Sequence, residues 1–163
     1  MKSPKYITPV LVSMLSLALV PMSHAEHFRS TQSLTTESNN ANFTKHRNEP
    51  SSVSGRTEAK GIGLFTAGSK EQEVVLVSMN GDFEGKPDSL KSRNSELLSF
   101  GDGSTIKLEL EGQSQGKRVS AKVVSAEGTG RFKGIKIDSA SLNGNALDPS
   151  LNYVEIEGDY ELP

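Results

Sequence analysis

The chain has 163 residues, with 18 Lys and Arg against 20 Asp and Glu, a formal net charge of −2, and no cysteine. A slightly acidic chain without a clustered basic run argues against nucleic-acid binding. The absence of cysteine excludes disulfide bonds, thiolate metal sites and a lipid-modified cysteine after a leader.

The first 25 residues have the parts of a secretory signal peptide. Lys2 and Lys5 give a positive start, residues 7–20 are mainly apolar, and residues 23–25 provide the small residues that precede a cleavage site. The apolar run, about 14 residues long, is too short to cross a bilayer as a helix. We therefore predict cleavage after Ala25 and an exported, periplasmic or extracellular chain of 138 residues without a membrane span.

Residues 26–57 are rich in Ser, Thr and Asn and predict a disordered N-terminal arm. Their few apolar side chains, Phe28, Leu34, Phe43 and Val53, show no period. Such a segment buries too little apolar surface to offset the chain entropy lost on ordering.

From residue 58 to residue 163 the pattern changes to short stretches with a period of two. Ile106, Leu108 and Leu110 alternate with charged residues, and segments 73–83, 118–125 and 153–162 alternate in the same way. Glycine-rich turns such as 101–104 separate them. This patterning, with one wet face, is typical of antiparallel sheet.

About seven or eight such strands fit into this region. We predict an all-β, antiparallel up-and-down barrel, calycin-like, whose last strand closes the sheet and removes its exposed edge. A barrel of eight strands is just wide enough to be filled by its own side chains or to hold one small ligand.

Three motifs carry a resemblance to a known family. They are Gly128-Thr-Gly-Arg-Phe-Lys-Gly-Ile-Lys136, Phe100-Gly-Asp-Gly-Ser-Thr-Ile106 and Tyr153-Val-Glu-Ile-Glu-Gly-Asp-Tyr-Glu-Leu162. Their order resembles that in the allene oxide cyclase and dirigent-like barrel superfamily, in particular its exported bacterial members of unknown function. The resemblance covers about residues 60–163, except that Ile137 stands where the family often has glycine. It implies the barrel and suggests homo-oligomers, and no catalytic residue is carried over.

The predicted barrel lacks the side chains of several catalytic systems. After cleavage the only histidines are His27 and His46, both in the predicted arm, so the barrel region has neither His nor Cys. This excludes a Ser-His-Asp or Cys-His nucleophile and a His-ligated metal there. We predict no catalytic residues, no metal site and no cofactor. His27, at mature position two, could bind copper weakly through the free amine, although an exposed arm residue is the favoured interpretation.

Three aromatic residues are the candidates for contact with a ligand. Tyr160 shares the apolar parity of the last strand, so its hydroxyl is expected inside the barrel or at its mouth. Phe132 and Phe83 are expected in the core, where they would also line any cavity. The acidic residues of the last strand, 155, 157, 159 and 161, are interpreted as a solvated face balanced by Arg118 or Lys122.

Three functions remain open at this stage. The first is a non-enzymatic binding module for a small apolar ligand in the barrel. The second is a cyclase or isomerase that steers an apolar substrate, which leaves enzymatic activity undecided. The third is an envelope interaction module with a filled core.

Overall fold

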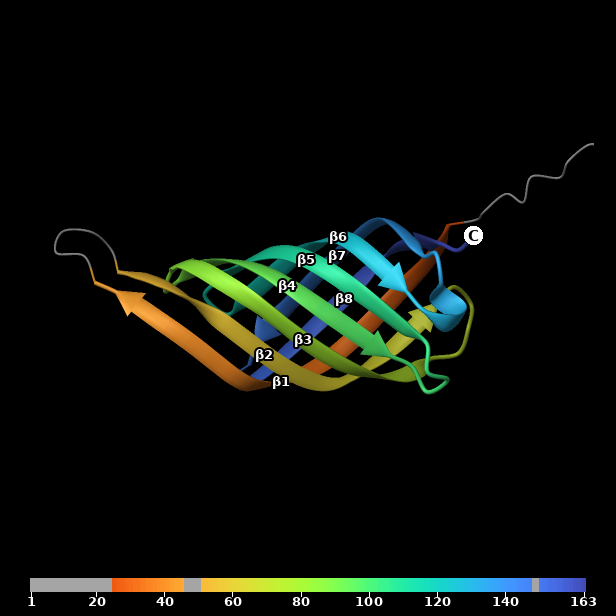
Figure 1. Cartoon of the computed structure of the whole chain (residues 1–163), viewed down its shortest axis with the longest axis horizontal. Coiled ribbons are helices and arrows are strands. Elements are labelled where there is room, and N and C mark those ends of the chain that lie inside the picture. The colour runs from red at the N-terminus through yellow and green to blue at the C-terminus, as the bar shows by residue number, and fades with distance from the viewer. Residues whose placement is uncertain (1–24, 46–50, 148–149) are drawn as a thin grey trace, which may run out of the picture.

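The computed structural model describes residues 25–45, 51–147 and 150–163, and these form one closed antiparallel barrel. Its eight strands pair in sequence order, and the last pairs with the first (Figure 1). The predicted all-β barrel is therefore confirmed. The predicted signal peptide lies outside the described residues, apart from Ala25.

The strands are long, each spanning at least eleven residues. They are β1 (Glu26–Thr44), β2 (Ser52–Ala67), β3 (Glu73–Lys86), β4 (Ser89–Ser99), β5 (Thr105–Gln115), β6 (Arg118–Gly128), β7 (Lys136–Ala146) and β8 (Leu151–Glu161), with one 3₁₀ turn, η1 (Gly130–Phe132), between β6 and β7. Among the described residues no helix is long and apolar enough to span a bilayer.

The strands are strongly staggered around the barrel. The register shows this when cross-strand partners are followed once around the barrel. Starting from Phe43 on β1, whose partner on β2 is Val53, the row of partners returns to β1 at Gln32. The start and the end of this row are eleven residues apart along β1. Such a stagger tilts the strands against the barrel axis, as Figure 1 shows. Beyond residue 36, β1 pairs only with β2, so this hairpin projects from one end (orange in Figure 1).

The prediction of a disordered arm over residues 26–57 is wrong. Residues 26–44 form β1, which closes the barrel against β8, and β2 begins at residue 52. The inward positions of β1 are Phe28, Ser30, Gln32 and Leu34, all buried. Two of the four, Ser30 and Gln32, are polar, so the apolar residues of β1 do not alternate with a period of two. Pairing with strands far away in the sequence then supplies the order that local composition does not predict.

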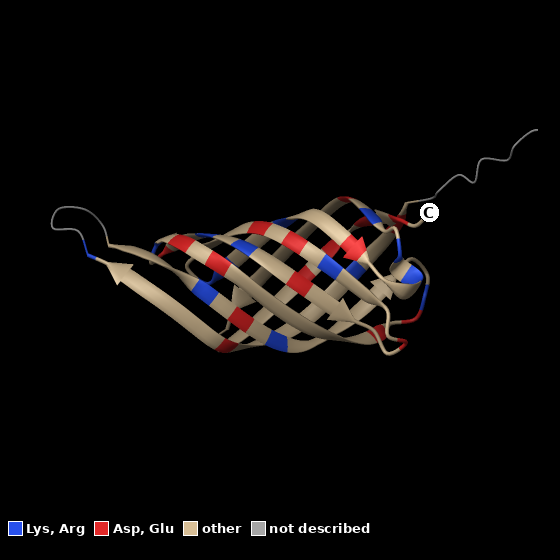
Figure 2. Cartoon of the chain, in the orientation of Figure 1, with Lys and Arg blue, Asp and Glu red and all other residues tan. Residues whose placement is uncertain are grey.

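The period of two seen elsewhere is confirmed by burial. Ile106, Leu108 and Leu110 on β5 are almost fully buried, and Val154, Ile156 and Tyr160 on β8 join them in one core. The charged residues between them are exposed or partly exposed. The core therefore lies inside the barrel, and the alternating charges lie on its outer surface, where both signs are interspersed (Figure 2).

Candidate functional site

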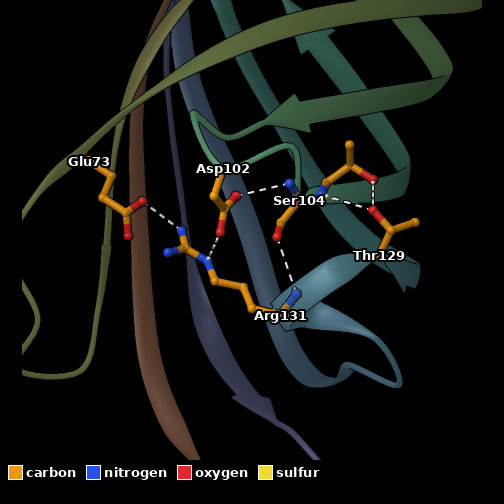
Figure 3. Close-up of polar contacts among 6 residues, drawn as sticks. Glu73, Asp102, Ser104, Thr129 and Arg131 are labelled. Atoms are coloured by element: carbon orange, nitrogen blue, oxygen red, sulfur yellow. Dashed lines mark hydrogen bonds and ion pairs between the residues drawn. The ribbon is translucent and has the colours of Figure 1, made fainter.

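Two of the three motifs meet at one end of the barrel. The Thr129 hydroxyl accepts a hydrogen bond from the backbone N–H of Thr105 at 3.1 Å. The hydroxyl groups of Thr129 and Thr105 form a second hydrogen bond at 2.8 Å. The Arg131 backbone N–H donates to the Ser104 hydroxyl at 3.2 Å (Figure 3). Gly130 has a φ of +58°, which favours glycine there, and turns η1 toward the 101–104 turn. The motifs are thus two halves of one cap.

Arg131 is the centre of this cap. Its guanidinium donates to Glu73 at 2.6 Å and lies 3.6 Å from a carboxylate oxygen of Asp102 (Figure 3). The same group lies over the rings of Phe100 and Phe132, at 4.9 and 4.8 Å from their centroids. The Ser104 amide, helped by the Arg131 charge, lowers the pKa of Asp102. These contacts close the end of the barrel, and the charges involved are already paired.

Beneath the cap lies an aromatic cluster, which we call the aromatic end. It consists of Phe28, Phe65, Phe100, Phe132 and Tyr160, with neighbouring ring centroids 4.6 to 6.1 Å apart. The recess enclosed beside it has a volume of about 10 Å³. That is room for about one water molecule. The aromatic end is therefore filled by its own side chains.

The structure brings two of the three predicted ligand-contact residues into this end. Tyr160 is buried, and its hydroxyl donates to the Glu26 carboxylate at 2.7 Å. Burial raises the pKa of Tyr160, and the Glu26 carboxylate adds to the effect. Phe132 packs on Phe65 and Phe100. Tyr160 therefore already has a partner for its polar group.

Phe83 lies in the other half of the barrel, away from Tyr160 and Phe132. It is partly buried and is the register partner of Gly55 and Ser92. Most inward residues of this region are small, and we call it the small-residue half. Its members are Gly55, Gly81, Ser92, Gly112 and Ala121. The three predicted residues therefore do not form one site.

A buried polar cluster was missed by the sequence reasoning. The Gln32 amide on β1 donates to the Glu96 carboxyl on β4 at 2.6 Å and to the Ser30 hydroxyl at 3.2 Å. Glu96 and Gln32 each retain one buried oxygen without a hydrogen-bond partner. Burial raises the pKa of Glu96 to about 7, although the Gln32 hydrogen bond opposes this. The sequence gives one signal for this burial. Glu96 is two residues from Leu98, so both side chains lie on the same face of the strand.

This cluster joins two strands across the barrel. A carboxyl with a pKa near 7 suits proton transfer. However, neither Glu96 nor Gln32 lines the enclosed recess at the aromatic end. A proton on Glu96 converts an unpaired acceptor into a donor, which lowers the cost of burying the group. The cluster is therefore a buried polar link without a described path to a substrate.

A second recess is a groove of about 1140 Å³ that crosses β2 to β7. Most of its lining side chains are exposed and have the parity that points away from the core, so the groove lies on the outer surface. Asp82, Arg93, Glu111 and Lys122 are successive cross-strand partners within it. Arg93 and Glu111 form an ion pair at 3.2 Å. The alternating charges compensate one another, so the groove does not select a strongly charged ligand.

An uncharged face lies on the outside of β2, β3 and β4. Ile62 pairs with Leu76, and Leu64 pairs with Val74, in adjacent rows of the sheet. Leu97 on β4 lies diagonal to Leu76. These five side chains are between 36% and 65% exposed. Clustered exposed apolar side chains mark surfaces that another molecule covers. We call these residues the apolar face.

The acidic face of β8 has different partners from those expected. β8 lies between β1 and β7, so Arg118 and Lys122 on β6 are not its neighbours. Arg29 on β1 donates to Glu155 at 2.6 Å, and the His27 Nδ1 lies 3.1 Å from Asp159. Within the described ranges no three His, Cys, Asp or Glu side chains cluster as metal ligands.

Comparisons with family models, curated proteins and solved structures find no match to this chain. The resemblance to the allene oxide cyclase and dirigent-like superfamily therefore stays a prediction.

Proposed function

We propose that this protein is an exported, non-enzymatic interaction module that works through its outer surface. Specifically, it associates with a second copy of itself through the apolar face of β2–β4. One contrast carries the proposal. The enclosed recess at the aromatic end has a volume of only about 10 Å³, whereas five apolar side chains are exposed on the outside of the sheet. A packed interior leaves no room for a small molecule there.

Charge at the rim favours a second copy as the partner. Lys60 on β2 is paired with Glu37 at 2.9 Å, and Arg131 is paired with Glu73. The flanking charges are compensated within the chain, so the face offers little electrostatic selection for a different, charged partner. Mixed and compensated rim charges also let the same face meet itself without like charges opposing each other. Uncharged faces of this kind resemble homodimer interfaces.

Closure of the barrel determines how association would occur. Edge-to-edge pairing needs a free strand edge, and the strands that carry the apolar face, β2, β3 and β4, each lie between two neighbouring strands of the sheet. Two barrels would therefore pack sheet against sheet, with the side chains of adjacent rows interdigitating. The paired rows Ile62–Leu76 and Leu64–Val74 are suited to this mode.

Sedimentation velocity and native mass spectrometry of the chain from residue 26 to residue 163 test the proposal. We expect a dimer that Leu76→Lys converts to a monomer. Val124→Lys is the matched control, since Val124 is 56% exposed on β6, outside the apolar face, and this change should leave the dimer intact. A monomeric wild-type chain, or a dimer unaffected by Leu76→Lys, would overturn the proposal.

The same native spectra test the prediction of a small apolar ligand in the barrel. A stoichiometric compound released on denaturation would favour that function over the interaction module. Turnover of such a compound would in turn favour the cyclase or isomerase. Cell fractionation and the intact mass of the exported chain test its location and the cleavage after Ala25.

A further inference from the structure

One edge of β1 has no neighbouring strand where the β1–β2 hairpin projects from the barrel (Figure 1). β8 pairs with β1 up to Thr35, and the Thr36 N–H still donates to the Ser150 carbonyl at 2.7 Å. From residue 38 to residue 44, β1 has β2 as its only partner strand among the described residues. The side chains of residues 39–44 are all exposed. We call residues 38–44 the β1 edge.

The backbone of the β1 edge directs unpaired polar groups to solvent. A Cβ added at Gly55 would meet the Asn40 carbonyl oxygen, so this carbonyl points toward β2. Backbone groups of successive residues in a strand point to opposite sides. The N–H and C=O groups of Asn39, Ala41 and Phe43 therefore point away from β2, and no described strand receives them. Such a row of groups is a template for pairing with another strand.

The features that usually protect a strand edge are missing from this stretch. Lysine, proline and bulges are common means of preventing edge pairing. The sequence of the β1 edge, Ser-Asn-Asn-Ala-Asn-Phe-Thr, has no charge and no proline. The register shift of β1 lies between Thr36 and Ser38, and pairing with β2 is regular from there to Thr44. The β1 edge is therefore available to a further strand over its whole length.

A second copy of this chain fits the β1 edge in antiparallel register. With a two-fold axis at Ala41, this residue lies opposite Ala41 of the second copy, and Asn39 lies opposite Phe43 of the second copy. Every outward N–H and C=O group of these three residues then has a partner. Phe43 is 72% exposed, and its diagonal neighbour across the contact is the small Ala41. The contact therefore leaves room for the ring and covers part of it.

Charge at the two ends of the β1 edge favours the same arrangement. Glu37 precedes the edge, and Lys45 follows it. The axis at Ala41 sets Glu37 of each copy against Lys45 of the other, so opposite charges meet at both ends. Both side chains are accessible, since Glu37 is 47% exposed and Lys45 is exposed. A parallel arrangement in the same register would instead set like charges against each other, which is unfavourable.

We propose that the β1 edge pairs antiparallel with the β1 edge of a second copy, in register about Ala41. The contact is separate from the apolar face and goes beyond the dimer proposed above. It is seven residues long, far smaller than a stable interface, so it forms at high local concentration. A chain with two different self-complementary contacts can extend beyond a dimer. The β1 edge would therefore join the dimers formed through the apolar face.

Cysteine cross-linking of the purified protein tests the proposal, because the chain has no cysteine of its own. In the proposed contact the two Cα atoms at position 41 lie about 5.5 Å apart, within the range that a disulfide spans. With oxidised glutathione as the oxidant, Ala41→Cys should form a covalent dimer about tenfold faster than Asn145→Cys. Asn145 is exposed on β7 between two paired strands, so this control measures random collisions. Equal rates for the two variants would overturn the proposal.

A mixture of two variants tests the register. Asn39 lies opposite Phe43 of the second copy but about 13 Å from Asn39 of that copy, since four residues separate the two positions along the strand. Asn39→Cys alone and Phe43→Cys alone should therefore cross-link slowly, whereas an equal mixture should give the mixed dimer. Mass spectrometry distinguishes the mixed dimer from the two homodimers. A mixture that cross-links no faster than either variant alone would overturn the register about Ala41.

The Leu76→Lys background separates this contact from the apolar face. In native mass spectrometry, cross-linked Ala41→Cys chains should form species larger than a dimer, and cross-linked chains that also carry Leu76→Lys should stop at the dimer. Cross-linked dimers in both backgrounds, without larger species, would support the β1 edge and contradict the apolar face. Cross-linking at the control rate in both backgrounds would overturn the edge contact and leave the apolar face to its own test.

Discussion

The two halves of the barrel are closed in different ways. At the aromatic end, five rings fill the interior and the Arg131 cap lies over them. In the small-residue half, the inward positions are mainly glycine, serine and alanine, and neighbouring strands crowd these positions. A Cβ added at Gly112 would lie 2.6 Å from the Ser120 carbonyl oxygen and 2.7 Å from the Ala121 Cβ. The interior of the aromatic end is filled by large side chains. In the small-residue half the backbones of neighbouring strands approach closely, which glycine allows because it has no side chain.

The largest effect is expected at the aromatic end. Phe132→Ala removes a buried ring that lies 4.6 Å from Phe100 and 6.0 Å from Phe65, centroid to centroid. The change should lower the free energy of unfolding by about 3–5 kcal/mol, through lost burial and the cavity left behind. Urea denaturation measures it. Phe43→Ala is the control, since Phe43 is 72% exposed and its loss should cost less than about 0.5 kcal/mol. Equal losses in the two variants would contradict a filled end.

The buried polar link should make stability depend on pH. Burial raises the pKa of Glu96 from 4.5 to about 7 in the folded chain. Between these values the folded chain binds more protons, so stability falls as pH rises, by up to about 1.4 kcal/mol per pH unit. The full effect, of order 3 kcal/mol, is reached above pH 7.

Glu96→Gln isolates this effect, because all other titrating groups are shared with the wild-type chain. The free energies of unfolding of both chains are measured at pH 5 and pH 8. The wild-type chain should lose about 2–3 kcal/mol more than the variant over that interval. Parallel pH profiles for the two chains would show that Glu96 is ionised at little cost.

In the small-residue half the sensitive change is an addition. Gly112→Ala should lower the free energy of unfolding by about 1–3 kcal/mol, because the new methyl group meets backbone and Cβ atoms of β6. Gly101→Ala is the control, since nothing lies within 4 Å of its added Cβ. Thermal denaturation compares the two variants. If Gly112→Ala left the free energy of unfolding unchanged, the interior of the small-residue half would have room for a methyl group.

The same contrast explains what the sequence predicts well. On β5, Ile106, Leu108 and Leu110 alternate with charges, so the strand and its buried face follow from the pattern alone. On β1, Ser30 and Gln32 occupy two of the four inward positions, so the pattern predicts a disordered arm in place of a strand. Their burial depends on Glu96, which is 64 residues from Gln32 in the sequence. A contact of that range leaves no local period. The two motifs of the cap can be recognised in the sequence. Their contact through Thr129 and Thr105 cannot be predicted from it.

The smallest effect is expected where the cap meets solvent. Arg131 is 39% exposed, so its ion pairs with Glu73 and Asp102 are partly screened. Its planar group also lies over Phe100 and Phe132, which a lysine ammonium cannot reproduce. Arg131→Lys keeps the charge and loses the stacked plane, and it should cost about 1 kcal/mol.

Arg93→Lys is the matched control for that change. Arg93 forms an ion pair with Glu111 but is 83% exposed, so the replacement should cost less than about 0.5 kcal/mol. Both variants are compared by urea denaturation at low and high salt. A loss in Arg131→Lys that persists at high salt assigns it to the rings, because salt screens exposed ion pairs but not stacking. A loss that disappears with salt would mean that the cap is held by charge alone, and that the rings beneath it close this end of the barrel unaided.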